Sequence, residues 1–517
     1  MLTGRLTAIL RVPDLRVGDE IEVEYTLPFI DPTFGDASFG MLFVGEEPAP
    51  GRMGLRLTWE DGQKPRVRMD DALQPLADMA AASLTISGDN LPALRAPTNA
   101  PPRYSWQRVL EFSDYADWQA VAAHLTPLFD EASRLPAGSS VQEEAERIAA
   151  AHSDPRARAE AALDLVQQEV RYVFVGLDGG NFRPASAIET WERRYGDCKG
   201  KSVLLMALLE ALDIPAELVL VNNSGLDDGL DQRLPNPAMF DHILVRAVID
   251  NEALWLDGTL PAAAPATANP FLPYRYGLPL TAGTKGLVSI DPAPKNAPDT
   301  VQLYEIDARE GTDGPARIVW TNISRGLAAI QGESQFSAMT KNQLESGLRD
   351  EFVGSGFESV ESVAWVFDPD TLTGSLTVTG RNRVDWDFGD EGYVSLVLPG
   401  GGFNPPPRRQ RADSQNTSAP FYSAPNYACH VTTVRLPTDT DPADWDHNSR
   451  FDTKIFGSVY YRGFEKRGDT IRMVRGSKTV DEEISPDMAD RDNERLSRFD
   501  NSMARISYYP DAAYGAD

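Results

Sequence analysis

The sequence predicts an α+β protein in which a mixed core is flanked by two β-rich, sandwich-like domains. Alternating strand patterns occupy both ends of the chain, whereas helical spacing begins after residue 112. A chain of 517 residues is too long for one hydrophobic core and suggests about three domains. We expect a β-rich N-terminal accessory domain at 1–112, a core with its preceding helices and a trailing linker at 113–299, and a β-rich C-terminal domain at 300–517.

Composition and charge exclude several classes of protein. The formal net charge of −28 argues against nucleic acid or an anionic membrane surface as a partner, because both require a basic surface. The two cysteines, Cys198 and Cys429, are too few for a disulfide framework. No Cys/His cluster has zinc spacing, and the acidic residues near Asp368 do not match a calcium loop. We therefore expect no metal and no cofactor.

The compartment and the oligomeric state stay open at this stage. No segment approaches the roughly 18–20 apolar residues that span a membrane, so we expect no integral membrane segment. The first residues contain no signal-peptide core and already have strand character. A periplasmic or exported location fits if the N-terminus of the given chain is incomplete.

The flanking regions show ordinary strand and turn signals. Residues 19–27 alternate polar and apolar, as a half-buried strand does, and residues 55–59 and 65–69 flank an Asp-Gly turn, which predicts a hairpin. After residue 300, we expect strands at 317–321 and 374–379 and one helix at 337–353. The glycine- and proline-rich residues 400–411 predict a mobile loop with solvated arginines.

The most informative stretch is residues 194–202, followed by the apolar run 203–212. Gly196 permits a tight turn, Asp197 is a favoured helix N-cap, and Cys198 then occupies the first helical position. A thiol at a helix N-terminus with two lysines nearby is favoured as the thiolate, although the Asp197 carboxylate opposes this. The alternative is that Cys198 is a small buried hydrophobic residue, as most free cysteines are.

Two later segments supply a base and a carboxylate. Residues 240–249 and 253–259 are expected to be strands joined by a turn at 250–252. If the connection has an even number of residues, His242 and Asp257 share one face of the hairpin, opposite each other or one diagonal step apart. Cys198 would then attack, His242 would take and return the proton, and Asp257 would orient the imidazole. The long polar loop at 222–239 leads into His242 and is expected at the mouth of the cleft.

The motifs Tyr-Gly-Asp-Cys-Lys at 195–199, Phe-Asp-His-Ile-Leu-Val at 240–245 and Trp-Leu-Asp-Gly-Thr at 255–259 resemble the catalytic core of the transglutaminase-like superfamily. The nearest branch comprises bacterial proteins with a β-rich domain of unknown function before that core. The resemblance covers about residues 140–262 and implies a papain-like fold, in which a helix that carries the cysteine packs on an antiparallel sheet. One departure is Gly200, where relatives often have an acidic residue.

The expected activity is thiol-dependent acyl transfer on protein or peptide amides, of the peptidase, amidase or transglutaminase type. The oxyanion needs two donors, of which one is the amide of Cys198. For the second, Tyr172 resembles the upstream donor of related enzymes, and Asn181 is a weaker choice. We favour hydrolysis because nothing indicates a calcium site or a cross-linking tunnel. The alternative is a non-catalytic scaffold that keeps the fold and binds peptides or envelope partners.

Overall fold

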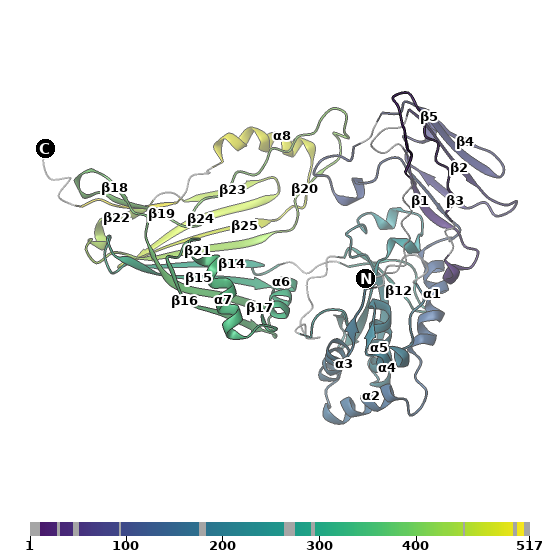
Figure 1. Cartoon of the computed structure of the whole chain (residues 1–517), viewed down its shortest axis with the longest axis horizontal. Helices are drawn as coiled ribbons and strands as arrows, with labels where there is room; N and C mark the ends of the chain where they lie inside the picture. Colours follow the sequence, from purple (N-terminus) through teal and green to yellow (C-terminus); the bar gives the residue numbers. More distant parts are fainter. Residues whose placement is uncertain are drawn as a thin grey trace.

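The computed structural model describes residues 11–27, 31–44, 51–92, 95–174, 182–262, 274–290, 295–447, 450–499 and 504–510. In Figure 1 the N-terminal strands (purple) and the helices of the core (blue to teal) lie at one end of the molecule. The C-terminal sheets (green to yellow) extend from them to the other end. The domain limits at 112 and 299 remain a proposal, and the sheets are described below without them.

The N-terminal part contains two small antiparallel sheets that share one apolar core. Their strands are, in spatial order, β1 (Phe39–Phe43), β6 (Val109–Ser113) and β3 (Arg66–Met69) in one sheet, and β2 (Arg52–Thr58), β5 (Ser83–Asp89) and β4 (Ala77–Met79) in the other. Leu84 and Ile86 from one sheet and Leu110 from the other are completely buried between them. This arrangement is sandwich-like, as predicted.

Two local predictions for this part are wrong. The strands on either side of the Asp-Gly turn do not form a hairpin, because β2 pairs with β5 and β3 pairs with β6. The turn instead carries the chain from one sheet to the other. Residues 19–27 alternate in polarity but form no strand, and Val23 and Tyr25 are exposed. Alternation alone does not make a strand when no neighbouring strand supplies hydrogen bonds.

The described residues of the core contain five helices. They are α1 (Trp118–Ser133), α2 (Ser140–Ala151), α3 (Pro155–Glu169), α4 (Ala187–Arg193) and α5 (Cys198–Ala211). Ser139 and Asp154 cap α2 and α3 through their side chains. Helix α5 is buried on nearly all sides because its apolar residues cover most of its circumference. It therefore lies at the centre of the core, packed against the other helices and the sheet.

The sheet of the core is antiparallel in all its pairings. Its order is β11 (Glu252–Leu256), β10 (His242–Ile249), β9 (Ala216–Val221), β12 (Tyr276–Pro279) and β13 (Val288–Ser289). A separate two-residue parallel pair, β7 (Arg171–Tyr172) and β8 (Tyr195–Gly196), lies just before α5. Ile243 and Val245 of β10 contribute to the same apolar core as α5, so the helix and the sheet form one unit.

The C-terminal part is built on an eight-stranded sheet. Its order is β16 (Ser359–Asp368), β17 (Thr373–Arg383), β15 (Pro315–Arg325), β14 (Thr300–Asp307), β21 (Tyr427–Arg435), β25 (Thr470–Thr479), β24 (Ser458–Arg467) and β23 (Phe451–Ile455). Only the β14–β21 pair is parallel among these described strands. A four-stranded sheet packs against it through a shared core and contains β18 (Asp387–Phe388), β19 (Val394–Val397), β27 (Arg505–Tyr508) and β22 (Trp445–His447).

The remaining elements complete this part: β20 (Phe421–Tyr422), β26 (Glu483–Ile484), α6 (Leu327–Phe336), α7 (Lys341–Phe352) and α8 (Pro486–Arg495). The predicted strands at 317–321 and 374–379 lie within β15 and β17. The helix predicted at 337–353 is α7, which begins at Lys341 because Thr340 forms a capping box at its start. Helix α6 precedes this range and was not predicted. The arginines of 400–411 are not all solvated, since Arg411 donates to the carbonyls of Thr98 and Pro420 and packs over Phe421.

Candidate active site

The cysteine lies at the first residue of α5, as predicted. Asp197 is the N-cap, and its Oδ1 accepts a hydrogen bond from the amide of Gly200 at 3.0 Å. Its Oδ2 pairs with the ammonium of Lys199. Because Cys198 is the first residue of α5, its thiol is near the positive end of the helix dipole. The residue is 1% exposed, so the thiol is shielded from bulk water.

The glycines on either side of the cysteine are required for space. The residue in the left-handed region is Arg194 (φ 56°), so the expectation that Gly196 makes the turn through its backbone freedom is wrong. A Cβ at position 196 would lie 3.0 Å from Cγ2 of Thr190, and a Cβ at position 200 would lie 2.8 Å from Oγ1 of the same residue. Gly200 therefore lets α4 approach α5 closely, which accounts for the absence of an acidic side chain at this position.

The β10–β11 hairpin brings His242 and Asp257 together. Its turn contains only Asp250 and Asn251, both with positive φ (54° and 63°), which is typical of a type I′ turn. The pairing of Ile249 with Glu252 sets a register in which His242 and Asp257 share a face and are one diagonal step apart. Their side chains are hydrogen-bonded, with 2.9 Å between Nε2 and Oδ2.

Thr259 holds the carboxylate of Asp257 in place. The amide and the hydroxyl of Thr259 donate to Oδ1 at 2.8 and 2.6 Å, which leaves Oδ2 for the imidazole. The side chain of Gln167 on α3 donates to the backbone carbonyl of Asp257 at 3.0 Å. Thr259 is the last residue of the Trp-Leu-Asp-Gly-Thr motif and was not among the expected site residues. The Asp-x-Thr spacing was a usable signal, because an aspartate side chain often accepts from the backbone two residues later.

The charges of the site stabilise a protonated imidazole. Burial lowers the pKa of His242, but the charge and hydrogen bond of Asp257, together with a hydrogen bond to Cys198, outweigh it and raise the pKa to about 10. Burial raises the pKa of Asp257, and the charge of His242 with the hydrogen bonds from His242 and Thr259 outweigh it, so the pKa is lowered. Since Nε2 is bonded to Asp257, the nitrogen that faces Cys198 is Nδ1.

Two buried side chains fix α5 relative to its neighbours. The hydroxyl of Ser202, one turn after Cys198, donates to the carbonyl of Ile243 at 3.0 Å and ties the helix to the strand that begins with His242. Lys201 is 2% exposed and donates its ammonium to the carbonyl of Val170. Burial lowers the pKa of Lys201 to about 8, and the charge of Asp257 acts in the opposite direction. The lysine thus lies within electrostatic reach of the Asp257 carboxylate.

Of the two expected oxyanion donors, Tyr172 is among the described residues and Asn181 is not. Tyr172 pairs with Gly196 in the short β7–β8 ladder, two residues before the cysteine. Burial, followed by the charge of Cys198, raises the pKa of Tyr172, so its hydroxyl lies within electrostatic reach of the sulfur. Its side chain is partly open to solvent, at 38% exposure. Asn181 lies outside the described residues.

The loop at 222–239 is held beside His242 by a set of hydrogen bonds. Asp241 accepts from the amides of Asn223 and Ser224 at 2.6 and 3.2 Å. The hydroxyl of Tyr274 donates to Asn223 at 2.6 Å, and Tyr274 is 5% exposed. Burial, then the charges of several groups including Asp257 and Cys198, raises the pKa of Tyr274. This tyrosine therefore borders the site, although no sequence motif pointed to it.

Arg103 of the N-terminal part contacts this loop, and carboxylates of the C-terminal part contact Arg103 and Arg275 beside it. Arg103, before β6, donates to Asp228 of the loop through its amide (2.9 Å) and to Glu483 of β26 through two guanidinium nitrogens (2.6 and 2.7 Å). Arg275, before β12, donates to Glu482 at 3.0 Å. Residues distant in the chain therefore meet at the loop that precedes His242.

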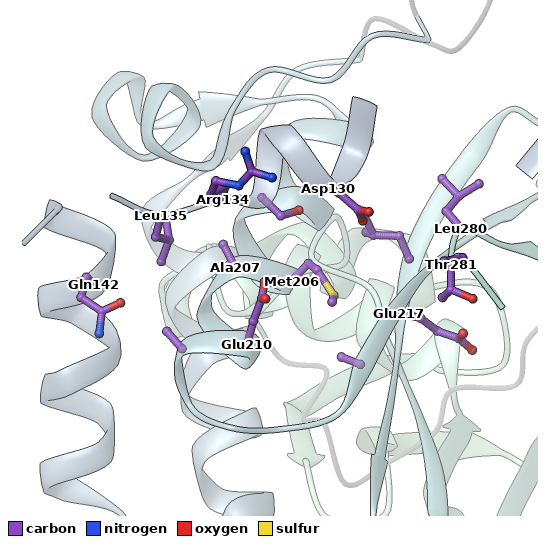
Figure 2. Close-up of a pocket in the computed structure, with 15 residues that line it drawn as sticks. Asp130, Arg134, Leu135, Gln142, Met206, Ala207, Glu210, Glu217, Leu280 and Thr281 are labelled. Atoms are coloured by element: carbon purple, nitrogen blue, oxygen red, sulfur yellow. The ribbon is translucent and has the colours of Figure 1, made fainter. Parts of the chain in front are cut away.

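A cavity of about 580 Å³ lies on the other side of the core (Figure 2). It is lined by residues of α1, by the C-terminal half of α5, by the start of β9 and by Leu280 to Ala282. Three carboxylates border it, those of Asp130, Glu210 and Glu217 (Figure 2). Because Cys198 is at the opposite end of α5, this cavity is not a substrate site for the thiol.

Two further features bear on the expected chemistry. Within the part of the chain that the structure describes, no three His, Cys, Asp or Glu side chains are grouped so that they could hold a metal ion. Over the same residues, no helix combines the length and the apolar character needed to cross a bilayer.

Comparisons with known proteins concern the family and the fold. Residues 142–256 match the model of the transglutaminase-like superfamily. The fold is similar to that of a putative protease from Parabacteroides distasonis ATCC 8503, at 12% identity and a TM-score of 0.54, over 92% of this chain and 76% of that one. Weaker matches are a putative cysteine protease from Cytophaga hutchinsonii (12% identity, TM-score 0.19, 43% of this chain and 71% of that one) and the periplasmic domain of TgpA from Pseudomonas aeruginosa bound to ethylmercury (15% identity, TM-score 0.19, 45% and 77%).

No curated protein matches the chain. The family match and the Parabacteroides fold confirm the α+β prediction and the predicted family resemblance.

Proposed function

From the premise that residues 142–256 form a transglutaminase-like core, we propose that this chain is a thiol-dependent enzyme that transfers acyl groups from protein or peptide amides. Cys198 is the nucleophile, His242 is the acid and base, and Asp257 orients the imidazole. The observation that carries the proposal is the hydrogen-bonded series from Cys198 through His242 to Asp257. Such a series at a helix N-terminus activates a thiol for attack on a carbonyl.

In the proposed reaction, the Cys198 thiolate attacks the amide carbonyl while His242 carries the proton on Nδ1. The carbonyl π electrons move to oxygen, and the oxyanion accepts a hydrogen bond from the backbone amide of Cys198. Tyr172 is the proposed second donor, because its hydroxyl is near the sulfur and retains its proton at neutral pH. Collapse of the intermediate breaks the C–N bond, and His242 gives its proton to the departing amine or ammonia, which leaves a thioester.

The acyl group then passes to water or to a second amine. His242 removes a proton from the incoming nucleophile, and the thioester C–S bond breaks to restore the thiolate. Water as acceptor gives a peptidase or amidase, and a lysine amine gives a cross-linked product. We favour hydrolysis, with a protein or peptide as substrate.

One observation favours the alternative of a non-catalytic scaffold. Cys198 and His242 are only 1% and 3% exposed, so the reacting atoms are covered in this conformation. A buried thiol also fits a purely structural role. The two functions differ in the reactivity of the thiol, because a scaffold has no need of a thiolate–imidazolium pair.

The test is labelling by limiting iodoacetamide between pH 5 and 9, followed by intact mass. A Cys429→Ser background leaves Cys198 as the single thiol, and a matched His242→Ala variant removes the imidazole. We expect Cys198 to react at pH 5–6, where a free thiol is almost fully protonated, and to slow in the His242→Ala variant. Labelling that follows an ordinary thiol titration in both proteins contradicts the enzyme and favours the scaffold.

A substrate screen follows from the first result. Peptides with internal glutamine or with free ends are incubated with the wild type and with Cys198→Ala, and the products are analysed by mass. A mass gain of one water indicates peptide hydrolysis, and the loss of ammonia with an added amine indicates cross-linking. Turnover that persists at the wild-type rate in Cys198→Ala excludes the proposed nucleophile.

A further inference from the structure

The C-terminal part contains a cavity of about 270 Å³ on one face of its eight-stranded sheet. It lies where β14 and β21 begin and β25 ends, because Gln302 is beside His430 in one ladder and His430 is beside Arg475 in the next. Side chains two apart share a face of a sheet, so six of the lining side chains face the cavity. They are Thr300, Gln302, Ala428, His430, Arg475 and Ser477. Phe403 also lines the cavity.

Arg475 is the unusual member of this set. Its Nε is buried without a hydrogen-bond partner, and no described residue forms an ion pair with its guanidinium. The ring centre of Phe403 lies 5.0 Å from its guanidinium carbon. Arg462 is directly opposite on β24 and is completely buried, so a second cation lies beside it. A guanidinium Nε that is buried without an acceptor is costly, and an acceptor from a ligand would remove that cost.

The rest of the lining supplies donors and no negative charge. No Asp or Glu is among the residues that line this cavity. The hydroxyl of Ser477 accepts from Asn426 at 3.2 Å and so keeps its own hydrogen to donate. Thr300 offers a hydroxyl and Gln302 an amide. All three can supplement a guanidinium in binding oxygen atoms.

The imidazole of His430 lines the cavity and is neutral. Its Nε2 lies 3.0 Å from the carbonyl of Pro399 and its Nδ1 lies 3.3 Å from Oε1 of Gln302, so both ring nitrogens have hydrogen-bond partners. Burial and the charge of Arg475 lower the pKa of His430 to about 4. A Cβ at position 400 would lie 2.2 Å from the imidazole of His430, so the glycine allows the loop to pack against this ring. The positive charge that faces the cavity is therefore that of Arg475.

We propose that this cavity, the Arg475 pocket, binds a small ligand that carries an oxyanion, either a carboxylate or a phosphate. The guanidinium is the anchor, because its planar fork matches two oxygen atoms of either group. Thr300, Gln302 and Ser477 donate to the remaining oxygens, and Phe403 covers the apolar part of an organic ligand. The pocket does not depend on the proposed chemistry at Cys198.

The experiment measures binding to the full chain by isothermal titration at constant ionic strength, with chloride as the balancing anion. Inorganic phosphate probes the phosphate source, and N-acetylglycine probes the carboxylate source. The variants are Arg475→Met and the control Arg472→Met, which removes an exposed arginine on the opposite face of the same strand. We expect saturable binding of one ion per chain in the wild type and the control, and binding about 10- to 100-fold weaker in Arg475→Met.

The outcomes decide the proposal and the source of the ligand. Tighter binding of phosphate or of N-acetylglycine identifies the preferred oxyanion. Equal affinity in Arg475→Met and the wild type, or no saturable binding of either probe to the wild type, overturns the proposal. If Arg475→Met does not fold, Thr300→Val keeps the charge and removes one donor, and we expect affinity about 3- to 10-fold weaker. Unchanged affinity in Thr300→Val then contradicts the assigned donors and overturns the pocket as described.

Discussion

Replacing Asp257 by asparagine tests whether a carboxylate keeps His242 protonated and correctly oriented. The amide of Thr259 needs an acceptor at 2.8 Å, so the asparagine must place its oxygen there and turn its NH₂ toward His242. That NH₂ donates to Nε2, which moves the imidazole proton to Nδ1, the nitrogen that faces Cys198. The histidine can then no longer accept the thiol proton.

The size of the effect follows from the charges at the site. Without the Asp257 charge, burial of the ring dominates, and the pKa of His242 should fall from about 10 to 6.5 or lower. At about 1.4 kcal/mol for each pKa unit, this removes on the order of 5 kcal/mol from the stability of the imidazolium. We expect alkylation of Cys198 at pH 7, and any turnover, to fall by about 10²- to 10⁴-fold, with a measurable remainder.

The assay is the rate of iodoacetamide labelling as a function of pH in the Cys429→Ser background. Thr259→Val is the matched control, because it removes only the 2.6 Å hydroxyl contact and keeps the charge and the amide. We expect a loss of about tenfold in that variant, between the wild type and Asp257→Asn. Labelling of Asp257→Asn within about twofold of the wild type at every pH would refute the electrostatic and tautomer reasoning.

Three further changes test the scaffold of the site. Ser202→Ala removes the buried hydrogen bond to Ile243 and should lower the free energy of unfolding by about 1–3 kcal/mol in a urea titration; an unchanged midpoint would show that α5 does not need this tie. Gly200→Ala should also lower the free energy of unfolding, by about 1–3 kcal/mol, although alanine favours helices. The reason is that the new Cβ would lie 2.8 Å from Oγ1 of Thr190. If this contact is the cause, adding Thr190→Ala should restore the stability. The raised pKa of His242 stabilises the fold fully below about pH 6.5, and this stabilisation is lost as the pH rises toward 10. The difference in the free energy of unfolding between the wild type and His242→Gln should therefore shrink between about pH 6.5 and 10. A constant difference over this range would contradict the assignment.

Local sequence signals were sufficient for the start of the helix and the face of the hairpin. Asp197 before an apolar run indicates a capped helix, and this depends only on the amides within the next turn. The strand period of two puts His242 and Asp257 on one face once the turn has an even number of residues. The helix start and the shared face of the hairpin both depend on residues close in the chain, so the sequence alone predicts them.

The sequence was less informative where the role of a residue depends on contacts with residues distant in the chain. The Asp-Gly turn predicts a hairpin, but β2 and β3 pair with other strands because register and partner choice depend on the packing of both sheets. Gly200 looks like a weak helix residue until Thr190 is placed against it. The loop residue Asp228 looks like ordinary surface charge until Arg103 reaches it from 125 residues away.

Three motifs in the sequence predicted the resemblance to the transglutaminase-like superfamily, and strand and helix patterns predicted the α+β class. The capped helix with its cysteine and the shared face of the histidine and aspartate followed from residue spacing and short-range hydrogen bonding. The folded structure was needed to show that Ser202 ties α5 to β10 and that Nε of Arg475 is buried beside a cavity without a hydrogen-bond partner. These features depend on which side chains meet after the chain has folded, and burial then sets their energies by removing the water that would otherwise satisfy them.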